Sequence, residues 1–93
     1  MISQTEFDRL TRLAGEAERL KADPSFAEIV ADLKSRAIRT WAEGKTPEAR
    51  ELAWHDLQAV GKLESYLAEL GQAYRMEAQK HKIEQERQRE RRS

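Results

Sequence analysis

The C-terminal half of this sequence contains a signal that starts a helix but none that would end one. Thr46 can cap a helix N-terminus, and Pro47 suits the first helical position, where its missing N–H leaves no hydrogen bond unmade. No proline follows Pro47, and the isolated residues Gly61 and Gly71 are the only weak points. We therefore expect a long helix that begins at Pro47 and continues into the C-terminal tail.

Apolar residues in this long segment recur at alternating intervals of three and four, as in a heptad repeat. The residues of this seam are Val60, Leu63, Leu67, Leu70 and Tyr74. The pattern predicts a coiled-coil-like surface through which copies of the chain can associate. Apolar residues become sparse after Tyr74, so we expect residues 75–93 to form a charged, net-basic helical extension or a frayed tail.

Two shorter helices are expected before this segment. Ser3 followed by Glu6 is a capping box that predicts a helix over about residues 4–22. Asp23 can cap the next helix, over about residues 24–43, because Pro24 then occupies its first position. Gly44 is expected to close this second helix as a left-handed cap.

The expected second helix has a wide apolar face of the kind that enters a core. Its members are Phe26, Ile29, Val30, Leu33, Ala37, Ile38 and Trp41. Short connections favour antiparallel packing of consecutive helices. We therefore predict an all-α fold, a helical hairpin with an additional N-terminal helix and a long C-terminal helix. Residues 1–74 would form the three-helix domain, with helices at about 4–22, 24–43 and 47–74.

The composition favours helices that pair with other helices. Charged residues make up 37% of the 93-residue chain, hydrophobic residues make up 39%, and there is no cysteine. A chain this short buries a modest core, and small unstapled domains often gain stability by oligomerisation. We expect a homo-oligomer. Without an N-terminal signal sequence or an apolar stretch long enough for a membrane span, we also expect a soluble cytoplasmic protein.

Residues suited to catalysis are few and scattered. His55 and His81 lack neighbours at metal-ligand spacing, and all four glycines are isolated, so no phosphate-binding loop is present. Both histidines are interpreted as solvated helix residues. We expect neither an enzyme nor a bound metal or cofactor.

The two tryptophans, Trp41 and Trp54, are expected near the turn of the hairpin. They can fill the hairpin core together with Phe26 and Ile38. Alternatively, one of them can lie partly exposed as an interface anchor, because aromatic residues dominate binding hot spots.

The tail combines both signs of charge. Residues 75–93 carry seven Lys or Arg residues against four Glu residues. The cations considered for binding are Lys80, Lys82, Arg87, Arg89, Arg91 and Arg92. They can stabilise a solvated helix end, or they can contact nucleic acid or an acidic protein surface. The four glutamates favour a protein partner over a nucleic acid.

A central block, roughly residues 20–73, carries a pattern of apolar and tryptophan positions. The block contains Asp23-Pro24-Ser25-Phe26, Ala37-Ile38-Arg39-Thr40-Trp41, Pro47-Glu48-Ala49-Arg50-Glu51-Leu52-Ala53-Trp54 and Leu70-Gly71. It resembles small α-helical proteins, themselves of unknown function, that tailed bacteriophages and prophages encode near genes for virion structure and assembly. The resemblance implies a helical hairpin and a phage setting, and it carries over no functional residue.

Together these features lead to one functional hypothesis and two alternatives. The leading hypothesis is a non-enzymatic phage-type structural or assembly protein that self-associates and docks its tail on a larger virion protein, such as a capsid, portal or packaging protein. One alternative is a small regulatory binder that inhibits a host defence or transcription protein. The other is a nucleic-acid-binding accessory protein that uses the basic tail. In each case the expected location is the host cytoplasm, with association with the virion under the first hypothesis.

Overall fold

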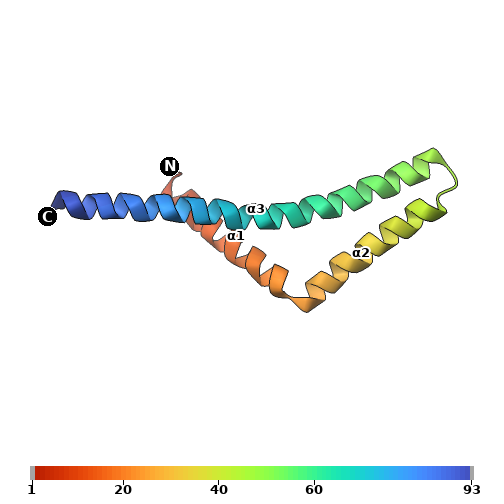
Figure 1. The fold of residues 1–93 in the computed structure, drawn as a ribbon, viewed down its shortest axis with the longest axis horizontal. Coiled ribbons are helices and arrows are strands. Elements are labelled where there is room, and N and C mark those ends of the chain that lie inside the picture. The colour runs from red at the N-terminus through yellow and green to blue at the C-terminus, as the bar shows by residue number, and fades with distance from the viewer. Residues whose placement is uncertain (1, 93) are drawn as a thin grey trace.

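Three helices make up nearly all of residues 2–92, the part of the chain that this computed structural model describes. They are α1 (Gln4–Ala22), α2 (Pro24–Glu43) and α3 (Pro47–Arg92), and Figure 1 shows their arrangement. The predicted all-α class is confirmed, and so are the bounds of the first two helices. The third helix continues through the predicted tail to Arg92 without a break.

Each helix begins at the capping residue that the sequence indicates. Ser3 Oγ accepts a hydrogen bond from the Glu6 N–H at 3.1 Å. The Asp23 carboxylate accepts from the Ser25 N–H at 2.8 Å, and Thr46 Oγ1 accepts from the Ala49 N–H at 3.1 Å. These side chains satisfy backbone donors that have no partner within the first turn of a helix.

The end of α2 differs from the prediction. Gly44 was expected in the left-handed region, but its backbone is extended, with φ −63° and ψ 123°. Glycine is needed here for space, because an added Cβ would lie 2.7 Å from Cγ of Arg50 and 3.2 Å from the carbonyl oxygen of Thr40. The expectation was wrong because the chain leaves α2 in an extended path that passes close to the first turns of α3.

The three helices form a long α3 with α1 and α2 placed one after the other along it (Figure 1). The 46 residues of α3 span about 69 Å. The hairpin of α2 and α3 is present as predicted. The antiparallel packing expected for α1 and α2 is wrong, because only Asp23 separates them and a helical hairpin needs a loop of about two to five residues. The two helices meet at a bend instead, and each packs on a different part of α3.

The apolar core is small. Its buried members are Ala14, Ala17, Val30, Ala37, Ala53 and Leu67, and no large side chain within residues 2–92 is completely buried. Alanine lets the helices approach closely, but it contributes little apolar area. The core therefore holds the three helices in register and leaves most of their larger apolar side chains at least partly exposed.

The wide apolar face predicted for α2 enters the core only in part. Val30 and Ala37 are buried, whereas four larger members of the face are about half exposed. Those four are Ile29, Leu33, Ile38 and Trp41. The expectation that the whole face is buried was wrong, because one helix, α3, covers only a narrow stripe along the middle of this wide surface.

Candidate interaction surface

The overall shape leaves much of the chain in contact with solvent. The molecule measures 72 × 27 × 16 Å, and its radius of gyration is 19.9 Å, against about 12 Å for a compact domain of this length. Its accessible surface is 7521 Å², whereas a compact monomer of this mass exposes about 5,500 Å². The isolated chain thus exposes about 2,000 Å² more than a compact fold would.

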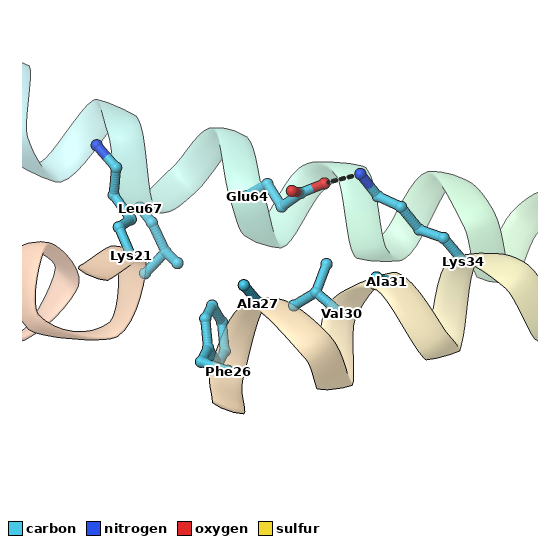
Figure 2. Close-up of a pocket in the computed structure, with 8 residues that line it drawn as sticks. All are labelled: Lys21, Phe26, Ala27, Val30, Ala31, Lys34, Glu64 and Leu67. Atoms are coloured by element: carbon cyan, nitrogen blue, oxygen red, sulfur yellow. Dashed lines mark ion pairs between the residues drawn. The ribbon is translucent and has the colours of Figure 1, made fainter. Parts of the chain in front are cut away.

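All three helices contribute residues to a depression around Leu67. This buried side chain faces the depression, whose volume is about 370 Å³ and into which the start of α2 and the end of α1 project (Figure 2). Lys34 of α2 forms an ion pair with Glu64 of α3 across one side of it. Lys21 pairs with Glu18 of its own helix at 3.5 Å. The charged groups around this depression already have ion-pair partners. We therefore interpret the depression as the place where the three helices pack together and not as a binding site.

Trp41 and Trp54 lie near the turn of the hairpin, as expected. They border a depression of about 270 Å³ whose remaining walls are Ala37, Ile38, Ala53 and Leu57, which we call the Trp cup. Trp41 is 51% exposed and Trp54 is 49% exposed. The structure therefore agrees with the second interpretation, in which a tryptophan lies partly exposed at the surface. Half-exposed tryptophans in an apolar cup are typical of protein-binding surfaces.

The predicted seam of α3 is used mainly inside the chain. Leu67 is buried, and Val60, Leu70 and Tyr74 are half-buried against α1 or α2. Leu63 is 46% exposed. This arrangement leaves Leu63 as the main member of the seam that another molecule can reach.

A second apolar surface joins α2 and α3 on the other side of Ala37 from the Trp cup. Ala37 lines both the Trp cup and a depression that contains Leu33 and Val60. Ile29 lies one helical turn before Leu33 and shares another depression with it. Leu63 lies three residues after Val60 and therefore on the same side of α3. We call Ile29, Leu33, Val60 and Leu63 the Leu33 face.

Sequence reasoning missed the Leu33 face because it assigned Ile29 and Leu33 to the core. The signal that could have found it is the width of the apolar face of α2. Residues 29, 33, 37 and 41 extend to both sides of the stripe that one helix can cover. A face that is wider than its partner helix predicts a second partner.

The distal part of α3 packs on the first turn of α1. The ring of Phe7 stacks on Tyr74 with centroids 6.0 Å apart and on His81 with centroids 4.1 Å apart. Packing therefore continues past residue 74, where the three-helix domain was predicted to end. His81 is half-buried, so its interpretation as a solvated residue was wrong, and its Nε2 is buried without a hydrogen-bond partner.

The last residues of α3 project beyond α1 (Figure 1). The cations of this segment lie on opposite sides of the helix. By helical spacing, Lys80, Arg87 and Arg91 share one side, and Lys82 and Arg89 share another; Arg92 ends the helix. The six cations therefore do not form a single stripe along the described part of the tail.

Neither a metal site nor a membrane span is found in the described chain. Residues 2–92 contain no group of three or more His, Cys, Asp or Glu side chains that could hold a metal ion. Across the same residues, none of the helices has the length and apolarity that crossing a membrane requires.

Comparison with known protein families, curated protein sequences and solved structures gives no significant match.

Proposed function

We propose that this chain is a non-enzymatic structural or assembly protein that self-associates and docks on a larger protein. The observation that carries the proposal is the exposure of large apolar side chains on a molecule without a substantial core. Within residues 2–92 these exposed side chains include Ile29, Leu33, Ile38, Trp41, Leu52, Trp54, Leu63, Tyr66, Met76 and Ile83. Large exposed apolar patches on soluble domains mark interaction sites.

The small size of the core supports the proposed self-association. Most of the buried side chains are alanines, which supply little hydrophobic free energy. Small domains without disulfides or metals commonly complete their cores by oligomerisation. Leu63 and its neighbours on the Leu33 face provide the apolar area that a second copy would cover.

The larger partner is proposed to contact the two regions that self-association through the Leu33 face leaves exposed. One is the Trp cup, and the other is the projecting end of α3 beyond His81. A phage setting, with a capsid, portal or packaging protein as partner, rests on the resemblance of residues 20–73 to phage-encoded helical proteins. The corresponding location is the host cytoplasm and, after assembly, the virion.

The basic tail supports nucleic-acid binding as a second candidate function. Residues 75–93 carry an excess of positive charge, and the last turns of α3, up to Arg92, project beyond α1. The distribution of the cations around the helix favours a protein partner, because a phosphate backbone is best followed by one continuous basic stripe. A regulatory binder that inhibits a host protein would use the same Trp cup.

Sedimentation velocity of the full chain at two concentrations tests self-association. We expect the weight-average mass to exceed that of the monomer and to rise with concentration. A strict monomer throughout the micromolar range would contradict the proposal. Retention on DNA at low salt, lost when residues 84–93 are deleted, would instead support the nucleic-acid candidate.

A further inference from the structure

A glutamate followed four residues later by a histidine occurs twice in α3, once on the surface and once under α1. The surface pair is Glu51 and His55, whose Oε1 and Nε2 atoms lie 3.6 Å apart and whose side chains are both exposed. The covered pair is Glu77 and His81, both of which are half-buried. The surface pair shows that this spacing lets the imidazole Nε2 approach the carboxylate one turn before it.

The covered pair contains two buried polar atoms that make no hydrogen bond. They are Oε2 of Glu77 and Nε2 of His81. The other carboxylate oxygen of Glu77, Oε1, lies 3.3 Å from Nζ of Lys80. Proton uptake by an imidazole places an N–H on both ring nitrogens, so a protonated His81 needs an acceptor at Nε2. Oε2 of Glu77 is an acceptor without a donor, and a bond between two charged groups is stronger than one from a neutral imidazole.

The contact with α1 also favours a protonated imidazole. The ring of Phe7 lies against the imidazole ring of His81 with centroids 4.1 Å apart and planes 22° apart. The face of an aromatic ring attracts a cation that lies within about 6 Å of its centroid. The residues of α1 one turn before and after Phe7 carry no charge that would oppose this attraction; they are Ser3, Gln4, Leu10 and Thr11.

The charged side chains around His81 come from both helices. Those nearest by helical position are Glu6, Asp8 and Arg9 on α1 and Glu77, Lys80, Lys82 and Glu84 on α3. Glu6 and Arg9 line the same depression beside Tyr66, and their opposite charges offset each other. Glu84 is half-buried one turn after His81, whereas both lysines are exposed to solvent. The covered side of α3 is therefore acidic around the imidazole.

We infer that His81 and Glu77 form a pH-sensitive switch that controls how firmly the start of α1 is held on α3. When His81 takes up a proton, its Nε2 donates to Oε2 of Glu77 beneath Phe7, and both buried atoms gain a partner. This bond is strong only while α1 keeps water away from it, so the folded chain binds the proton more tightly than the unfolded chain does. The added stability is therefore present below about pH 6.5, where imidazoles ordinarily titrate, and is lost as the pH rises.

A double-mutant cycle at two pH values tests this switch. The full chain, Glu77→Gln, His81→Gln and the double variant are unfolded with urea at pH 5.5 and at pH 8.0, at one protein concentration. We expect a coupling of about tenfold in the unfolding equilibrium constant at pH 5.5 and of less than about twofold at pH 8.0. The matched control is the same cycle with Glu51→Gln and His55→Gln, which have the same spacing but are exposed. Its coupling should stay at about twofold or less at both pH values.

Hydrogen exchange of the unsubstituted chain gives a second measurement, which does not depend on whether the variants fold. After correction for the intrinsic exchange rate at each pH, the amides of α1 around Phe7 should open about tenfold less often at pH 5.5 than at pH 8.0. Opening that is as frequent at pH 5.5 as at pH 8.0 would overturn the switch. A coupling between Glu77 and His81 that does not change with pH, or that is no larger than that of the exposed pair, would overturn it as well. Either result would leave the proposed self-association untouched, because the switch does not depend on a second copy.

Discussion

Phe7, in the first turn of α1, stacks on the imidazole of His81 in the distal part of α3, with ring centroids 4.1 Å apart and planes 22° apart. This contact connects two residues from near opposite ends of the chain. It fixes how far along α3 the packed body extends. Glu77 lies one turn before His81, and its side chain is only 15% exposed.

Replacing Phe7 with Ala is expected to destabilise the chain by about 2 kcal/mol, since the ring is half-buried and full truncation of a core Phe costs about 3–5 kcal/mol. Urea denaturation measures the loss. Hydrogen exchange of the amides around His81 should accelerate at the same time, because α3 loses its cover there. Phe7→Leu, which keeps an apolar side chain, is the control and should lose clearly less. Unchanged exchange near His81 in Phe7→Ala would contradict the role of this stack.

Helix starts were predictable because each depends on local chemistry. Ser3, Asp23 and Thr46 bond to backbone N–H groups two or three residues later, so the residues that decide these starts are neighbours in the sequence. The continuity of α3 was predictable for the same reason, because nothing after Pro47 interrupts it. The all-α class follows from these local signals.

The way that the helices meet was not predictable. The spacing of apolar residues marks a face of a helix, but it does not say which helix will cover that face. His55 and His81 look alike in sequence, yet among the described residues only His81 stacks on an aromatic ring. The bend at Asp23 directs α1 back to α3, and this places Phe7 of α1 against His81. The need for a glycine at position 44 likewise depends on tertiary packing, because the side chain that an added Cβ would meet belongs to Arg50 on the next helix. Partial exposure of Trp41 or Trp54 was anticipated as one of two alternatives, whereas Ile29 and Leu33 were assigned to the core.

Asp23 forms the whole connection between α1 and α2, so its cap is expected to matter. Asp23→Ala removes the acceptor for the Ser25 N–H and should cost about 1 kcal/mol. Asp23→Asn keeps a side-chain acceptor and should cost only a few tenths of that amount. The midpoints of urea unfolding compare the two variants. Equal losses in both would show that the hydrogen bond is not what stabilises this start.

The glycines inside the helices are expected to divide into two kinds. An added Cβ would meet open space at Gly15 and Gly61, so Gly15→Ala and Gly61→Ala should each stabilise the chain by up to about 1 kcal/mol. Gly71 is buried where α1 crosses α3, and its added Cβ would lie 3.3 Å from Oε1 of Glu18.

Larger side chains at this crossing test how closely α1 approaches α3. Gly71→Leu should destabilise the chain by about 1–3 kcal/mol, because it overpacks the crossing. Gly71→Ala is the matched control. It should be tolerated, because the Glu18 carboxylate is the mobile end of a long side chain and can move aside. Thermal unfolding monitored by circular dichroism ranks these two variants together with Gly15→Ala and Gly61→Ala. A neutral Gly71→Leu would mean that α1 does not pack here in solution.

The ion pair between Lys34 and Glu64 is expected to contribute less than about 1 kcal/mol, because the two side chains are 40% and 43% exposed and water screens the pair. A double-mutant cycle with Lys34→Met and Glu64→Gln isolates the coupling energy. A coupling above about 2 kcal/mol would contradict a screened surface pair.

The most direct test of self-association is the dependence of thermal stability on protein concentration. If a second copy completes the small core of this chain, association stabilises the folded state by mass action. Circular dichroism should then show the unfolding midpoint of the full chain rising by a few °C for each tenfold increase in concentration. An unfolding midpoint that stays constant from the low micromolar range to about a hundred times that concentration would contradict the account.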